Sequence, residues 1–168
     1  ELLGLGYSDS ELERMAVELG ADVPVFIKGG EEYAEGVGDE LSSSQLPVMG
    51  AVLLITPPTK VSTKWAYAEA IKYLPDGYST GKFPAASGNS EEWKLFENDF
   101  EPLVFQTYPE IGTIKDRLLR LNAVFASLSG SGSTVFGIFE DEADAHKALT
   151  SFSPPLQTFL AHPIKIRN

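Results

Sequence analysis

The feature that most constrains this chain is a glycine–serine stretch enclosed by apolar residues, in the segment FASLSGSGSTVFGIF at 125–139. The apolar flanks predict two buried strands, at about 124–128 and 134–139, joined by residues 129–133. A linker between domains does not fit, because both flanks hold the stretch inside a fold. The stretch also differs from known nucleotide loops, since no Gly-Lys-Ser/Thr follows it and it leads into no helix.

Two interpretations of residues 129–133 remain open. In the first, the glycines only supply backbone at positive φ for a connection between strands. In the second, this backbone also lets a ligand approach closely, with N–H groups and serine hydroxyls as its partners.

Short strands and amphipathic helices alternate along the rest of the chain. Ser8 and Glu11 have the spacing of a capping box and begin a helix that Gly20 ends, and a later helix follows an Asp141 cap. Extended runs are expected at 22–27, within 28–41, at 51–56 and, as an edge strand, at 157–166. Four helices are expected, one of them beginning near Ser62, and each has an apolar face that should point into the core. These faces consist of Leu12, Met15, Ala16 and Leu19; of Tyr67, Ala70, Ile71 and Leu74; of Ile111, Ile114, Leu118 and Leu121; and of Ala145, Ala148, Leu149 and Phe152.

This mixture of helices with strands that pair as hairpin neighbours predicts an α+β fold. Residues 75–92 are rich in glycine, proline and serine and predict a surface loop. No internal repeat is present.

Composition and charge exclude several kinds of site. The net charge of −11, with only 13 scattered lysines and arginines, argues against nucleic-acid binding. The absence of cysteine excludes disulfides and thiolate metal sites, and the spacing of His146 and His162 predicts no metal centre. The longest apolar runs, 51–55 and 23–27, are too short to span a bilayer. We therefore expect a cytoplasmic protein without a membrane or nucleic-acid partner, in which backbone N–H groups or a few cations would have to attract any anion.

Asp22 lies between the end of the first helix and a Val-Pro pair that favours extended backbone. Its carboxylate is either a loop group that bonds local N–H donors or a group aimed into a cleft. In a cleft it could act as a general base towards a hydroxyl, or orient that hydroxyl.

Four segments, in this order and spacing, resemble a known kinase family: LGADVPVFIKGGEEYAEGVGDEL, PPTKVSTKWAY, NDFEPLVFQTYPEI and SGSGSTVFGIF. They are similar to the kinases of 4-diphosphocytidyl-2-C-methyl-D-erythritol, within the superfamily named after galactokinase, homoserine kinase, mevalonate kinase and phosphomevalonate kinase (GHMP). The resemblance is weakest at 75–97 and after residue 150. It implies ATP-dependent phosphorylation of a hydroxyl of a cytidine diphosphate sugar alcohol, on the methylerythritol phosphate route to isoprenoid precursors, with Mg²⁺ on the phosphates of ATP.

The same resemblance implies roles for individual residues. Asp22 matches the catalytic aspartate, which activates or orients the attacking hydroxyl. Thr63 and Tyr67 fall where the family contacts the cytidine end, with the tyrosine ring stacked on the base. Because Tyr67 also belongs to an apolar helical stripe, a place in the core remains the alternative. The residues that match the third glycine-rich motif, near the nucleotide phosphates, are Ser129, Gly130, Ser131, Gly132 and Ser133.

The resemblance also implies a domain organisation. Residues 1–46 would complete an N-terminal kinase domain, and residues 47–168 would form a ferredoxin-like C-terminal domain. The family's catalytic lysine and main phosphate loop do not occur here, so we expect the missing N-terminal half of the same polypeptide as a partner and no activity from this part alone. The alternatives are another kinase of the superfamily, acting for example on homoserine or mevalonate, and a non-catalytic ligand-binding module of the same fold.

Overall fold

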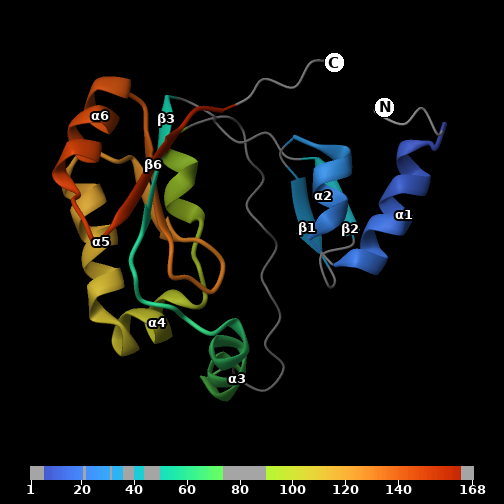
Figure 1. Cartoon of the computed structure of the whole chain (residues 1–168), viewed down its shortest axis with the longest axis horizontal. Coiled ribbons are helices and arrows are strands. Elements are labelled where there is room, and N and C mark those ends of the chain that lie inside the picture. Colours follow the sequence, from blue (N-terminus) through green and yellow to red (C-terminus); the bar gives the residue numbers. More distant parts are fainter. Residues whose placement is uncertain are drawn as a thin grey trace. The chain divides into compact units, whose positions relative to one another are not determined.

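The predicted mixture of helices and strands is present in the computed structural model, which describes residues 6–20, 22–30, 32–35, 40–43, 50–73 and 90–163. The chain divides into two units, which are described separately (Figure 1). The first unit holds the helices α1 (Asp9–Leu19) and α2 (Val23–Lys28) and the antiparallel strands β1 (Glu32–Glu35) and β2 (Glu40–Ser43).

Helix α1 begins where the capping signal predicts. The Ser8 N–H donates to Glu11 Oε2 at 2.8 Å, and the Gly20 N–H closes the last turn on the Ala16 carbonyl. The predicted inward face is only partly buried, however, because Leu19 is 81% exposed and Ala16 alone lies in the interior. Helix α1 packs mainly on the short α2, which covers a narrow strip of its surface.

The extended run expected at 22–27 is wrong: these residues lead into and form α2. Pro24 stands in the first turn of that helix, where a backbone N–H has no intrahelical acceptor to reach. The proline is therefore compatible with the first turn of α2, and the preference of Val23 for extended backbone before a proline is overridden.

The second unit is a sheet with helices packed on it. Its strands have the order β4-β5-β3-β6 and every neighbouring pair is antiparallel, as in a ferredoxin-like α+β fold, which confirms the predicted fold class. Its elements are β3 (Ala51–Thr56), α3 (Thr63–Tyr73), the 3₁₀ helix η1 (Ser90–Leu95), α4 (Glu101–Thr107), α5 (Pro109–Arg120), β4 (Phe125–Leu128), β5 (Val135–Phe139), α6 (Glu142–Ser151) and β6 (Gln157–Ala161).

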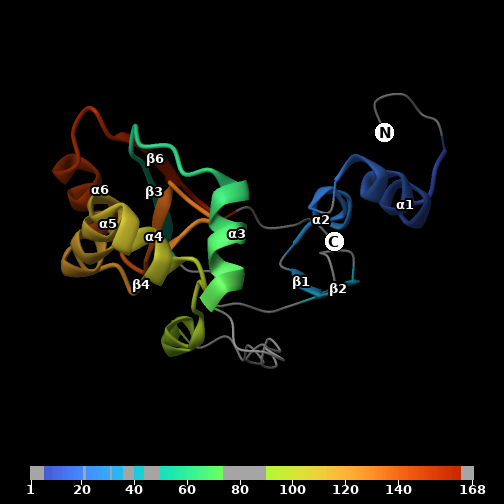
Figure 2. The ribbon, with the colours of Figure 1, turned by 90° about the horizontal axis from the view of Figure 1, so that it is seen from below.

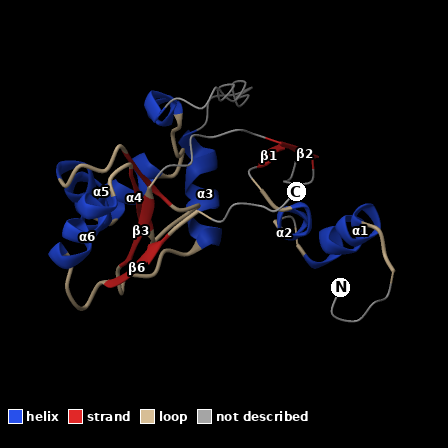
Figure 3. Ribbon diagram, turned by 90° about the horizontal axis from the view of Figure 1, so that it is seen from above, coloured by secondary structure: helices blue, strands red, loops and turns tan. Residues whose placement is uncertain are grey.

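Helices α5 and α6 lie side by side against one face of this sheet (Figures 1 and 2), and Figure 3 shows them on one side of β3 and β6. Alternate residues of β3, such as Leu53 and Ile55, are fully buried under them. Gly137 of β5 permits this close approach, because a Cβ there would lie 3.1 Å from the side chain of Leu118 in α5. The buried residues of β3 therefore follow the period of two of a strand.

Helices α5 and α6 confirm the predicted cap and buried apolar faces, and α3 does not. Asp141 caps α6 by accepting from the Ala143 N–H at 2.7 Å, and the apolar stripe of α5 is buried. In α3, by contrast, Tyr67 is 57% and Ile71 68% exposed, because this helix packs mainly on α4 and turns Trp65 and Ala66 towards the core instead.

Parts of other predictions lie outside the described residues: 75–89 of the expected surface loop, 164–166 of the edge strand, and Leu74. The last residues of that loop, 90–92, are the beginning of η1. Helix α4 is an element that the sequence analysis did not predict. None of the helices within the described ranges has the length and apolar character needed to traverse a bilayer.

Candidate functional site

The glycine–serine loop, residues 129–133, joins β4 to β5 as a tight connection between antiparallel neighbours. The Ser129 N–H donates to the Thr134 carbonyl at 2.8 Å, and the Gly132 N–H donates to the Ser129 carbonyl at 2.9 Å. Gly130 and Gly132 have φ of 55° and 93°, which confirms the predicted need for positive φ. Gly132 is also packed closely, since a Cβ there would lie 3.0 Å from a methyl group of Leu128.

One side of this loop is open and carries hydrogen-bond donors. Among the described residues, no protein group accepts from the N–H of Gly130, Ser131 or Ser133. A Cβ built on Gly130 would have nothing within 4 Å. Neighbouring free N–H groups in a glycine turn are the usual protein partners of an anion.

Asn98, just before α4, holds the opposite side of the loop. Its side-chain nitrogen Nδ2 donates to the Leu128 carbonyl at 2.8 Å and to the Gly130 carbonyl at 2.9 Å. Its Oδ1 accepts from the Phe100 N–H at 2.9 Å. Both ends of the amide are therefore engaged, and the loop is tied to the start of α4.

Glu101, at the start of α4, fixes the strand that leads into the loop. Its Oε1 accepts from the Ser127 hydroxyl at 3.0 Å and from the Leu128 N–H at 2.9 Å. Its Oε2 forms an ion pair with Lys115 of α5. The carboxylate is largely buried, so this ion pair compensates its charge.

Helix α3 contacts the loop from its first residue. The hydroxyls of Thr63 and Ser131 share a hydrogen bond of 3.0 Å. One turn later, the rings of Tyr67 and Phe100 form a T-shaped pair, with 4.9 Å between centroids and an angle of 73°. Tyr67 is a surface residue, so the interpretation that placed it in the core is wrong.

The structure thus brings Thr63, Tyr67 and residues 129–133 to one end of the second unit. Sequence reasoning missed Asn98 and Glu101 as partners of the loop. The segment NDFEP contributed to the resemblance, but an asparagine before a helix ordinarily suggests a local cap. Nothing local in the sequence points to acceptors about thirty residues away.

Asp22 belongs to the first unit, where it directly precedes α2. Its backbone is helical, with φ of −86° and ψ of −7°, and its exposed carboxylate forms no capping hydrogen bond. Among the described residues, the alternative in which Asp22 bonds local N–H donors is therefore not observed. The carboxylate is free to accept a hydrogen bond from a ligand.

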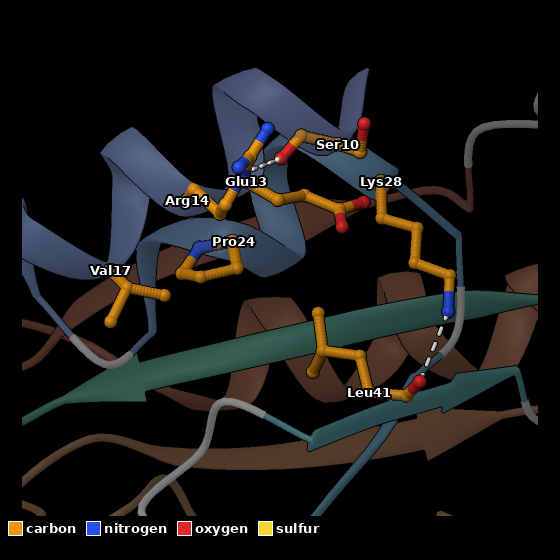
Figure 4. Close-up of a pocket in the computed structure, with 7 residues that line it drawn as sticks. All are labelled: Ser10, Glu13, Arg14, Val17, Pro24, Lys28 and Leu41. Atoms are coloured by element: carbon orange, nitrogen blue, oxygen red, sulfur yellow. Dashed lines mark hydrogen bonds between the residues drawn. The ribbon is translucent and has the colours of Figure 1, made fainter. Parts of the chain in front are cut away.

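The first unit also contains a small pocket of about 280 Å³ between α1, α2 and β2 (Figure 4). Both of its cations have protein partners. The Lys28 ammonium donates to Glu32 at 2.8 Å and to the Leu41 carbonyl at 3.3 Å, and Arg14 donates to the Ser10 carbonyl. The pocket contains none of the predicted site residues; it is lined by Ser10, Glu13, Arg14, Val17, Pro24, Lys28 and Leu41.

Within the described ranges, no cluster of three or more histidine, aspartate or glutamate side chains could hold a metal ion. His146 and His162, far apart in the sequence, both approach Glu142 on the surface of the second unit. The distances from their Nε2 atoms to Glu142 Oε1 are 3.7 Å and 3.0 Å.

Comparisons with known proteins place these features in a family context. Residues 85–153 match the model of the GHMP kinases C-terminal family. The chain is 40% identical over 151 residues to a 4-diphosphocytidyl-2-C-methyl-D-erythritol kinase of Prosthecochloris aestuarii, covering 87% of this chain and 53% of the relative. A kinase of the same name from Syntrophotalea carbinolica is 41% identical over 155 residues, covering 91% and 54%.

Solved structures give the same result at the level of the fold. A crystal structure of 4-(cytidine 5'-diphospho)-2C-methyl-D-erythritol kinase is similar with a TM-score of 0.74 at 25% identity, over 95% of this chain and 58% of that one. Homoserine kinase from Cytophaga hutchinsonii has a TM-score of 0.62 at 21% identity, over 95% and 59%, and shares the fold alone. The chain spans about half the length of the relatives that it matches.

Proposed function

We propose, from the similarity of this chain to GHMP kinases, that it forms the carboxyl-terminal part of a kinase. That enzyme would transfer a phosphoryl group from ATP to a hydroxyl of 4-diphosphocytidyl-2-C-methyl-D-erythritol, in the cytoplasm, on the non-mevalonate route to isoprenoid precursors. The observation that carries the proposal is the 40% identity, over 87% of this chain, with a kinase of that name.

The proposal concerns a polypeptide longer than this chain, because the chain spans about half of that relative. Residues 1–46 would complete its amino-terminal kinase domain, and residues 47–168 would be its carboxyl-terminal domain. The amino-terminal half would supply the main phosphate loop and the catalytic lysine that the family resemblance implies.

In this proposal the glycine–serine loop binds the phosphates of the nucleotide. The free N–H groups of Gly130, Ser131 and Ser133 support it, because backbone donors attract an anion without a nearby cation. This matters in a chain whose net charge is −11, where side chains alone would repel ATP. Gly132 keeps the turn tight, and the Ser129 hydroxyl lies at its exposed edge.

Thr63 and Tyr67 would hold the cytidine end of the substrate. Tyr67 is exposed enough for its ring to stack on a base, and its contact with Phe100 restricts the motion of the ring. The hydrogen bond between Thr63 and Ser131 would keep this end of α3 in register with the phosphate loop.

Asp22 would act on the substrate hydroxyl. The hydroxyl oxygen attacks the γ-phosphorus, the bond from that phosphorus to ADP breaks, and the hydroxyl proton passes to the Asp22 carboxylate. If Asp22 only orients the hydroxyl, the proton passes to an oxygen of the transferred phosphoryl group. ATP brings Mg²⁺ on its phosphates. Within the described ranges no cluster of three or more histidine, aspartate or glutamate side chains could hold the ion, and we assign it no ligand from this chain.

The test is a chimaera in which the unmatched amino-terminal part of the Prosthecochloris aestuarii kinase precedes residues 1–168. ADP release is measured with ATP and, in turn, 4-diphosphocytidyl-2-C-methyl-D-erythritol, homoserine or mevalonate. We expect turnover with the first acceptor alone, and its loss in the same chimaera carrying Asp22→Asn. Turnover with homoserine or mevalonate instead would make the chain part of another kinase of the superfamily. A folded chimaera that binds ATP without any turnover would support the non-catalytic module.

A further inference from the structure

We infer that Asn98 is a positioning residue that directs the Ser131 N–H of the glycine–serine loop towards the ligand. Its amide holds the carbonyls of Leu128 and Gly130 on the inner side of the loop. The inference deepens the proposed function, on which it rests for the identity of the ligand, a nucleotide phosphate. The geometry of the loop itself does not depend on that function.

The peptide bond between Gly130 and Ser131 is trans. In a trans peptide the C=O and N–H bonds point in opposite directions across one plane. Because Asn98 holds the Gly130 oxygen at 2.9 Å, the Ser131 N–H is turned away from Asn98. It meets no protein acceptor there among the described residues.

The segment 98–101 also holds the residue from which the loop departs. Asn98 bonds the carbonyl of Leu128, and Glu101 bonds the N–H of the same residue. Leu128 is thereby fixed at both of its backbone polar groups. The segment 98–101, together with the pairing of β4, therefore sets the direction in which the chain enters the loop.

An asparagine is the side chain that suits this position. Its Oδ1 accepts from the Phe100 N–H, which orients the amide so that Nδ2 points to the loop. An aspartate could still accept from Phe100 but has no donor for the two carbonyls. Its negative charge would repel the carbonyls and attract the Ser131 N–H, so the Gly130–Ser131 peptide would turn over.

The first test uses the ¹⁵N-labelled chain of residues 1–168 carrying Asn98→Asp, with Asn122→Asp as the matched control. Asn122 donates to Asp144 at 3.1 Å at the opposite end of β4, and its φ of 71° suits aspartate as well as asparagine. We expect the Ser131 amide proton to move downfield and to exchange more slowly with solvent in Asn98→Asp alone. A Ser131 amide that behaves alike in both variants and the wild type would overturn the inference, whatever the enzyme does.

Asn98→Ala is a second variant that tests the inference if the charged variant Asn98→Asp does not fold. This substitution removes the side-chain donors without adding a carboxylate. We therefore expect the Ser131 N–H to point in more than one direction, and the amide protons of Ser129 and Gly132 to exchange faster with solvent. The amides of Leu53 and Gly137, in the centre of the sheet, should keep their wild-type exchange rates. Unchanged loop amides in this variant would equally overturn the inference.

The second test places Asn98→Asp and Asn122→Asp in the chimaera. We expect kcat/KM for ATP to fall about tenfold or more in Asn98→Asp and to stay at the wild-type value in Asn122→Asp, because a misdirected donor leaves a phosphate oxygen unsatisfied. The KM for the cytidylyl substrate and the melting temperature should stay close to wild type. A lower melting temperature with unchanged kcat/KM would show that Asn98 only stabilises the fold. An inactive wild-type chimaera would contradict the proposed function, and the amide experiment would still decide the role of Asn98.

Discussion

Tyr67 combines a ring contact with wide exposure to solvent. Its ring packs against Phe100 in a T-shaped arrangement, and 57% of the residue remains exposed. A ring in this state has lost part of its motional freedom before any ligand arrives, which lowers the entropy cost of stacking on a base. Ile71, on the next turn of α3, is exposed without a ring contact and provides an internal comparison.

We predict that Tyr67→Leu raises the KM for the cytidylyl substrate, since an aromatic platform contributes roughly 1–3 kcal/mol to holding a base. The KM for ATP should not change, and the melting temperature should stay within a few degrees, because the residue is exposed. Ile71→Ala is the control and should leave both KM values unchanged. A large fall in melting temperature with both KM values intact would remove Tyr67 from the site. Steady-state kinetics of the chimaera and a thermal melt provide these measurements.

For Asp22 we predict that Asn in its place lowers kcat by about 10²–10⁴-fold, the usual cost of losing a positioned base. The KM values should change little, because the loss acts on the transition state. The exposed carboxylate forms no capping hydrogen bond, so the melting temperature should also be retained. If kcat fell less than about tenfold, a structural role for Asp22 would replace the catalytic one.

At the scale of elements, α4 joins α5 to β4 through a single carboxylate. Glu101 pairs with Lys115 on one oxygen and holds Ser127 and Leu128 on the other. We predict that Glu101→Gln lowers the free energy of unfolding by about 1–3 kcal/mol, because the partly buried Lys115 is left without its counter-charge. Lys147→Gln, which breaks an exposed pair with Asp144, should have no measurable effect. Equal effects of the two variants in urea unfolding would contradict this account of α4.

The start of α1 should be sensitive to acid. The hydrogen bond from the Ser8 N–H, and then the one from its hydroxyl, hold the pKa of the Glu11 carboxyl below its usual value of 4.5. A folded-state pKa below the unfolded one means that the stabilisation is complete above pH 4.5 and is lost as the pH falls through the lowered value. We predict that the Ser8 amide proton titrates in that acid range and that Glu11→Gln abolishes the titration. A Ser8 amide unaffected by this substitution would refute the proposed cap.

For the whole molecule, we predict that residues 1–168 alone release no ADP from ATP and the cytidylyl substrate. The chain spans about half of its relatives, and catalysis of phosphoryl transfer rests on positioning every group around the phosphates at once. A coupled assay with the chimaera as positive control measures this. Turnover by the chain alone at a rate comparable to the chimaera would show that these residues suffice.

The sequence by itself determined the features that depend on near neighbours. The glycines at 130 and 132, the cap at Asp141 and the buried stripe of α5 could all be predicted, because backbone conformation, capping and helical period act over a few residues. The same local rules explain the error at α2. The restriction on the residue before Pro24 predicts extended backbone, but a proline is also favoured in the first turn of a helix.

Only the tertiary structure decided which distant groups meet. Asn98 reaches the Gly130 carbonyl across 32 positions, and Thr63 reaches Ser131 across 68. These long-range contacts depend on the strand order β4-β5-β3-β6 and on where α3 and α4 pack. Neither can be read from the local pattern of the sequence. The exposure of Tyr67 has the same origin. An apolar stripe predicts a face that could be buried, and the neighbours present in three dimensions determine whether it is.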